Sequence, residues 1–62
     1  MNYTLDFNYE NGDIGNKNFI KDILTNNNVI FREFEDEQGI HLEYDSSNFE
    51  RVKNLLNNNE EF

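Results

Sequence analysis

The chain has 62 residues, with 13 acidic and 5 basic side chains and a formal net charge of −8 at pH 7. A chain this short buries only about 60% of its unfolded surface, so we expect a single acidic domain over residues 1–62. The absence of cysteine excludes disulfides and thiolate metal sites. The negative charge argues against direct binding to nucleic acid or to an anionic membrane, and it favours a basic protein partner.

The composition indicates AT-rich coding, because asparagine occurs 13 times while alanine, proline and tryptophan are absent. Lysine codons are equally AT-rich, yet the only lysines are Lys17, Lys21 and Lys53. We interpret this mismatch as a sign that the acidity is selected, with chance in a short chain as the alternative. The N-terminus has no signal-peptide pattern and no apolar run approaches about 18 residues, so we expect a soluble cytoplasmic protein.

The first element is a strand over residues 3–9, where apolar and polar side chains alternate. The apolar members are Tyr3, Leu5, Phe7 and Tyr9. A turn-rich loop follows at residues 11–15. Asn16 is a candidate N-cap for a helix that begins at Lys17.

That helix carries its apolar residues at helical spacing, namely Phe19, Ile20, Ile23 and Leu24. Asn26–Asn28 should end it, because asparagine tolerates the left-handed conformation found at helix C-termini. Residues 29–35 and 40–44 read as two strands, and the segment Asp36–Gly39 between them reads as a hairpin turn.

The last element is a second helix, with Ser47 and Glu50 in the spacing of a capping box. Its apolar stripe consists of Phe49, Val52, Leu55 and Leu56. We expect the tail from Asn57 to Phe62 to fray.

The predicted fold is therefore α+β with the order β-α-β-β-α, a ferredoxin-like arrangement that lacks the last strand. Right-handed crossover geometry favours strand order 1-3-2, with two helices packed on one face of a three-stranded sheet. A simple 1-2-3 order is the alternative that the sequence leaves open.

The open face of such a sheet is solvated, and strand alternation decides which side chains occupy it. Two registers are possible for the second strand. The first turns Phe31, Glu33 and Glu35 outward and places Arg32 inward, where its long stem can still reach solvent. The second buries Phe31 but drives Glu33 inward, and a buried unpaired carboxylate is costly. We therefore expect the first register.

This register predicts an acidic partner-binding surface on the open face and at the hairpin tip. Its members are Asp6, Phe31, Glu33, Glu35, Asp36, Glu37 and Glu43. Carboxylates two residues apart on a strand lie roughly 6.6–6.8 Å apart, which suggests a row that imitates nucleic-acid phosphates. Ordinary solvation of a one-sided sheet is the alternative interpretation.

Catalytic and metal-binding patterns are weak in this sequence. His41 is the only histidine, so a zinc site would need an unusual set of carboxylate ligands, and Ser46 and Ser47 are not placed beside it by any pattern. Aligning Gly39 with the EF-hand glycine puts Phe34 at the first ligand position, which breaks that motif. We expect no enzyme activity, no metal and no cofactor.

Two functions remain as hypotheses. The first is a non-catalytic inhibitor that binds a basic, nucleic-acid-handling protein, of the kind that a phage or mobile element uses against host defence; its compartment would then be the host cytoplasm. The second is a homodimeric structural or regulatory module that assembles through an edge strand. The edge residues would be Tyr3, Leu5, Phe7 and Tyr9.

Overall fold

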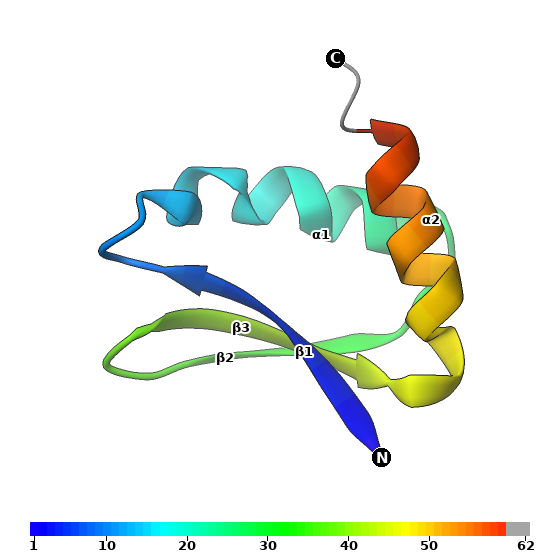
Figure 1. Ribbon diagram of the computed structural model, residues 1–62, viewed down its shortest axis with the longest axis horizontal. Helices are drawn as coiled ribbons and strands as arrows, with labels where there is room; N and C mark the ends of the chain where they lie inside the picture. Colours follow the sequence, from blue (N-terminus) through cyan, green and yellow to red (C-terminus); the bar gives the residue numbers. More distant parts are fainter. Residues whose placement is uncertain (60–62) are drawn as a thin grey trace.

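The computed structural model describes residues 1–59 and has three strands and two α-helices in that range (Figure 1). The strands are β1 (Asn2–Asn8), β2 (Phe31–Glu35) and β3 (Gly39–Asp45). The helices are α1 (Lys17–Asn26) and α2 (Phe49–Asn59). Short 3₁₀ turns precede both helices, at Asp13–Asn16 and Ser46–Asn48. The predicted order β-α-β-β-α is confirmed.

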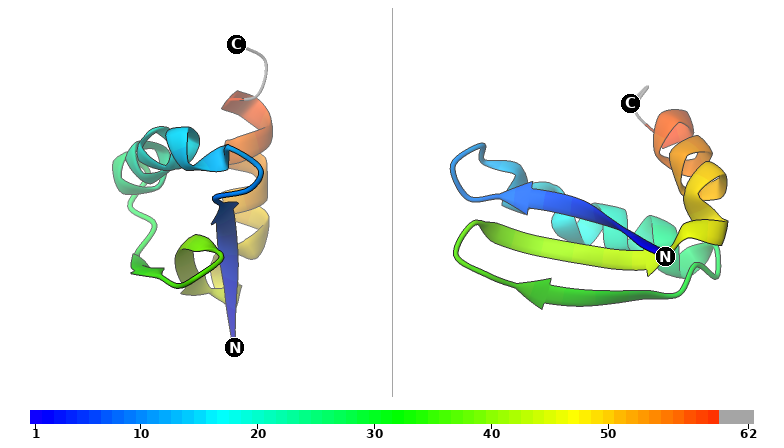
Figure 2. Two further views of the ribbon diagram at one scale, coloured as in Figure 1. Left: turned by 90° about the vertical axis from the view of Figure 1, so that its left-hand side faces the viewer. Right: turned by 60° about the horizontal axis from the view of Figure 1, so that its bottom comes forward.

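The strands form one antiparallel sheet in the order β1-β3-β2, so the predicted 1-3-2 order is confirmed and the 1-2-3 alternative is wrong (Figure 2). Because β3 is antiparallel to both neighbours, β1 and β2 run parallel to each other at the two edges. The connection from β1 through α1 to β2 is therefore the crossover that the handedness rule predicts.

The core lies between the sheet and the two helices. Its buried cluster consists of Phe7, Leu24, Val29, Leu42, Tyr44 and Val52. Leu24 from α1, Val52 from α2 and Leu42 from β3 have side chains that are almost completely buried. Full burial of one such side chain contributes about 1.5–3 kcal/mol, so these three residues join the helices to one face of the sheet.

The register of β2 differs from the predicted one. Glu33 pairs with Leu42 and Phe31 pairs with Tyr44, so Phe31, Glu33 and Glu35 lie on the helix side of the sheet. Arg32 and the neighbouring Phe34 lie on the open face instead. The four-residue turn Asp36–Gly39 sets this register, because it places Glu35 opposite Ile40 and fixes every pair behind it.

Two lysines of α1 pair with Glu33, so this register does not bury an unpaired carboxylate. Lys21 Nζ lies 2.6 Å from Glu33 Oε1, and Lys17 Nζ lies 3.3 Å from Glu33 Oε2. Glu33 stands on an edge strand and remains partly exposed, so its charge is paired and hydrated rather than buried alone. These contacts lower the pKa of Glu33, the hydrogen bond from Lys21 most strongly.

The helix ends also differ from the predictions. Asn16 has helical dihedral angles and makes no capping hydrogen bond, because a 3₁₀ turn runs directly into α1. The backbone amide of Ser47 donates to Asp45 Oδ2 at 2.9 Å, so Asp45 caps the segment before α2 and the predicted capping box is not formed. Helix α2 continues to Asn59, which corrects the predicted fraying of residues 57–59; residues 60–62 lie outside the described range. Asn28 does adopt the left-handed conformation, with φ 60°.

Gly39 allows β1 and β3 to approach closely where the hairpin begins. A Cβ atom at this position would lie 2.0 Å from the Phe7 carbonyl oxygen and 2.9 Å from the Phe7 carbonyl carbon. Both atoms belong to the backbone of the neighbouring strand and cannot turn aside. Glycine is therefore required for the Asn8–Gly39 pair to form.

Candidate functional site

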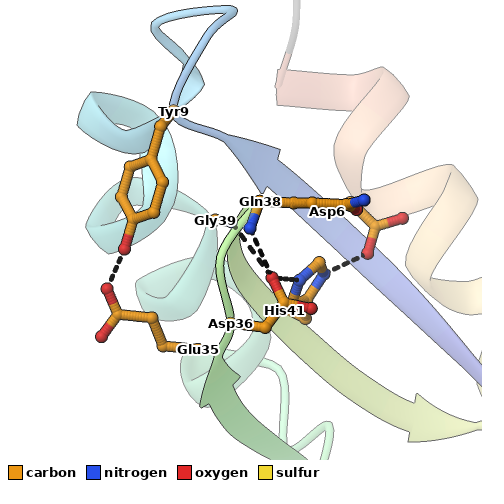
Figure 3. Close-up of polar contacts among 7 residues, drawn as sticks. All are labelled: Asp6, Tyr9, Glu35, Asp36, Gln38, Gly39 and His41. Carbon is orange, nitrogen blue, oxygen red and sulfur yellow. Dashed lines mark hydrogen bonds and ion pairs between the residues drawn. The ribbon is translucent and has the colours of Figure 1, made fainter.

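The open face of the sheet is centred on His41, which is buried although it points away from the hydrophobic core. Its direct cross-strand neighbours are Asp6 on β1 and Phe34 on β2. The turn after β2 adds Asp36, so one carboxylate faces the imidazole from β1 and another from the turn (Figure 3).

Each ring nitrogen of His41 faces one carboxylate. Nδ1 lies 2.6 Å from Asp6 Oδ1 in hydrogen-bond geometry. Nε2 lies 2.9 Å from Asp36 Oδ1, which is an ion-pair distance, although no acceptor within residues 1–59 is aligned for a hydrogen bond to Nε2. Asp36 Oδ1 already accepts the backbone amides of Gln38 at 2.9 Å and Gly39 at 3.2 Å. We call the Asp6–His41–Asp36 contacts the His41 bridge.

The two carboxylates change the titration of the histidine. Asp36, followed by Asp6, raises the pKa of His41 above its usual value, because both stabilise the imidazolium more than desolvation penalises it. The contact with His41 in turn lowers the pKa of Asp36, and the amides of Gln38 and Gly39 support the ionised form as well. The bridge therefore favours a cationic ring between two anions.

Phe34 covers the imidazole from the β2 side. The two rings are stacked with centroids 5.0 Å apart, and Arg32 Cζ lies 5.3 Å from the Phe34 centroid. Arg32 Nη2 also lies 2.8 Å from Glu43 Oε1. An arginine and an aromatic ring thus occupy the part of the open face where the sequence predicted Glu33 and Glu35.

Four carboxylates gather at the end of the sheet where the hairpin turns. We call this group the acidic tip; it consists of Glu10, Glu35, Asp36 and Glu37. The amide of Tyr9 donates to the Gln38 carbonyl at 3.0 Å, which holds the start of the β1–α1 loop against the hairpin turn. The Tyr9 hydroxyl donates to Glu35. Glu10 and Glu37 line one shallow hollow between the two segments.

The structure brings together only some of the predicted partner-binding residues. Asp6 and Asp36 meet at His41, while Glu37 stays exposed in the turn. Glu43 lies on the open face as predicted, but Arg32 neutralises it. The predicted continuous acidic row on this face is therefore wrong.

The remaining predicted members lie on the other side of the sheet. Phe31 packs against the core, Glu33 binds the two lysines of α1, and Glu35 contacts Tyr9. Whether any of these side chains contacts a partner stays a prediction.

The geometry offers little for metal binding or catalysis. Among residues 1–59 no three histidine or carboxylate side chains form a metal-binding group. Asp6 and Asp36 face opposite ring nitrogens, so they do not converge with the imidazole on one ion. Ser46 and Ser47 lie past the far end of β3, roughly 16 Å or more along the chain from His41. In the same range of residues, neither helix is long and apolar enough to cross a membrane.

No protein-family model, no curated protein and no solved structure matches this chain. Its function must therefore be argued from its own residues.

The sequence interpretation missed the central position of His41 and the roles of Arg32 and Phe34. The signal was present in the length of the hairpin turn. Counting back from a four-residue turn at Asp36–Gly39 places Phe34 opposite His41, and the 1-3-2 order then adds β1 on the other side.

Proposed function

We propose that this chain is a non-catalytic acidic interaction protein that binds and inhibits a basic, nucleic-acid-handling protein, of phage or mobile-element anti-defence type. The acidic tip would carry the contact. It would occupy a cationic site where the partner otherwise binds nucleic-acid phosphates.

One observation supports the proposal above others: among residues 1–59 no lysine or arginine pairs with a carboxylate of the acidic tip, although Asp36 also faces the His41 ring. Lys17 and Lys21 contact Glu33, and Arg32 contacts Glu43. Arg51 and Lys53 belong to α2, at the opposite end of the molecule from the hairpin turn (Figure 1). Negative charge without a lysine or arginine partner is therefore concentrated at the acidic tip.

A protruding anionic turn suits a concave cationic site. Long-range attraction accelerates the encounter of oppositely charged surfaces, and added salt screens it over about 8–10 Å. The proposal therefore requires binding that weakens as ionic strength rises. A purely hydrophobic contact would show the opposite trend or none.

The test compares the wild-type chain with two variants of equal charge. Glu10→Gln/Glu37→Gln removes two charges from the acidic tip, at side chains that make no contact with the His41 bridge. Asp22→Asn/Glu50→Gln removes two charges from the helices. Each chain is immobilised and exposed to host-cell lysate at low and moderate salt, captured proteins are identified, and the purified partner is assayed on its nucleic-acid substrate.

We expect a basic protein that wild type and the helix variant capture and inhibit, and that the tip variant releases. Capture of no basic protein at either salt concentration would refute the proposal. Equal capture by both variants would show that net charge, and not the acidic tip, attracts the partner. Capture without inhibition would leave an adaptor in place of an inhibitor.

A second candidate function, a homodimeric module, is favoured by the contrast between the two sheet edges. Strand β1 has one charged residue in seven, Asp6, whereas β2 has three in five. Charged side chains protect an edge against pairing, so β1 is the less protected edge. Tyr3 near its start and Tyr9 directly after its end are 41% and 45% exposed.

The hydrogen bonds of β1 define how such a dimer would pair. The Tyr9 amide donates to the Gln38 carbonyl and the Ser46 amide to the Met1 carbonyl, so odd-numbered residues bond to β3. The even-numbered residues, Asn2 to Asn8, direct their backbone groups outward. Antiparallel pairing centred on Leu5 places Thr4 opposite the second copy's Asp6 and keeps the two Asp6 carboxylates from facing each other directly.

Thr4→Pro tests this pairing, because it removes one outward amide and no bond to β3. Light scattering at micromolar concentration should report a wild-type dimer, a Thr4→Pro monomer and a dimer for the control Thr4→Val. A wild-type monomer near 7.5 kDa would remove this candidate.

A further inference from the structure

Within residues 1–59, the His41 bridge is the one place where the open face connects an edge strand to the hairpin turn through titratable groups. Asp6 faces the ring from β1, and Asp36 faces it from the turn. From β2, the Phe34 ring stacks on the imidazole, and Arg32 lies over the other ring, that of Phe34. Arg32 also pairs with Glu43 of β3. The protonation state of His41 therefore decides how these two carboxylates are held.

The two nitrogens of the ring are not equivalent. An imidazolium donates from both nitrogens, whereas a neutral imidazole donates from one and presents a lone pair at the other. Nδ1 makes an aligned 2.6 Å hydrogen bond to Asp6. Nε2 has no aligned acceptor among the described residues, and the oxygen beside it already accepts two amides. Asp36 raises the pKa of the charged ring most, but only Nδ1 has an aligned acceptor, so the geometry favours Nε2 as the nitrogen that loses its proton first.

We propose that His41 is a pH-sensitive connection between β1 and the hairpin turn, which holds Asp36 when the ring is protonated and releases it when Nε2 loses its proton. This inference does not depend on the proposed partner-binding function.

The released state follows from the same distances. A neutral ring that keeps its proton on Nδ1 retains the bond to Asp6 and turns a lone pair toward Asp36, 2.9 Å away. The repulsion favours a rotation of the Asp36 side chain away from the ring. The Gln38 and Gly39 amides then lose the oxygen that accepts them, and the turn becomes easier to open.

Nuclear magnetic resonance of the intact chain tests the proposal directly, because His41 is the only histidine. We expect its titration midpoint to lie above the usual value of about 6.5. The Gln38 and Gly39 amides should shift with the same midpoint and exchange faster above it. The imidazole nitrogen shifts should show the Nδ1–H tautomer in the neutral form. An Nε2–H tautomer, or turn amides that do not follow the histidine, would overturn the proposal.

A matched pair of turn variants separates contact from net charge. Asp36→Asn removes the carboxylate at Nε2, and Glu37→Gln removes the same charge from the next residue, which does not touch the ring. We expect Asp36→Asn to lower the His41 midpoint clearly more than Glu37→Gln does. Equal shifts in the two variants would mean that distant charge raises the midpoint, and the bridge would be refuted. The tautomer measurement on wild type decides the question even if Asp36→Asn does not fold.

Discussion

The three glycines of this chain predict a graded series of stabilities when each is replaced by alanine. At Gly39 the added Cβ would lie 2.0 Å from the Phe7 carbonyl oxygen, and φ is +158°. Either the strands separate at this end of the β1–β3 pair or the turn changes its path. An unfavourable backbone conformation costs about 1–3 kcal/mol and an overpacked contact about 1–3 kcal/mol, so Gly39→Ala should cost about 2–6 kcal/mol.

The other two glycines serve as controls. Gly12 has φ +71° but no atom within 4 Å of an added Cβ, so Gly12→Ala should cost only the left-handed backbone penalty of about 1–2 kcal/mol. Gly15 also has no atom within 4 Å and lies outside the left-handed region. Gly15→Ala should therefore stabilise the fold by about 0.4–1 kcal/mol through the unfolded chain.

Urea unfolding monitored by circular dichroism measures the series at one pH and one salt concentration. The reasoning requires the order Gly15→Ala, wild type, Gly12→Ala, Gly39→Ala, from most to least stable. A Gly39→Ala chain as stable as Gly12→Ala would show that β1 and β3 do not approach as closely as described. Loss of cooperative unfolding in Gly39→Ala, with retained cooperativity in the other two, agrees with the expected strand separation.

Three further outcomes follow from the core and the ion pairs. Leu42→Ala should cost about 2–5 kcal/mol, a large part of the roughly 3–9 kcal/mol expected for a chain of this length, and urea unfolding would then start from a partly unfolded population. The pKa of His41 is raised in the folded chain, so its contribution to the free energy of unfolding is complete below about pH 6.5 and is lost as the pH rises through the folded pKa. The pKa of Asp36 is lowered in the folded chain, so its contribution is lost as the pH falls from about 3.9. Unfolding free energy should therefore be greatest between these limits, and His41→Gln should remove the alkaline decline; a decline of equal size in His41→Gln would contradict this assignment. Glu33→Gln should cost at most about 1 kcal/mol, because the pair with Lys21 is exposed to solvent, and the difference from wild type should shrink in high salt; a salt-independent loss would indicate packing instead.

The fold was predictable from sequence wherever a local pattern and a general rule agreed. Alternation from Tyr3 to Tyr9 located β1, and the left-handed tolerance of asparagine placed the end of α1 within Asn26–Asn28, where the helix ends at Asn26 and Asn28 is left-handed. Crossover handedness then selected the 1-3-2 order without any contact being known. The helix starts were not predictable in this way, because Asp45 and Glu50 can both accept the Ser47 amide and only three-dimensional geometry selects Asp45.

The candidate site was predictable only in part, because its chemistry depends on pairs from distant segments. The cost of turning Glu33 toward the helices depends on Lys17 and Lys21, which reach it from α1 and which no pattern in the sequence places beside it. The cost of burying a carboxylate depends on side chains from distant segments, whereas the length of a turn can be read locally and fixes the register of the strands. When the two disagree on an edge strand, turn length is the more reliable guide, and it leads directly to His41.

The two proposed functions place different parts of the chain in contact with a partner, and they can be combined in one assembly. Pairing of β1 with a second β1 is antiparallel, so the two acidic tips would stand at opposite ends of a six-stranded sheet, separated by at least the length of a seven-residue strand, about 23 Å. A dimer would therefore present two separate anionic turns and would not form one denser acidic surface. Each tip would bind a basic site independently, and avidity would arise only for a partner that carries two such sites at a matching distance. Thr4→Pro should then leave the affinity for a single basic site unchanged while it lowers the stoichiometry of the complex, whereas Glu10→Gln/Glu37→Gln should weaken binding in monomer and dimer alike.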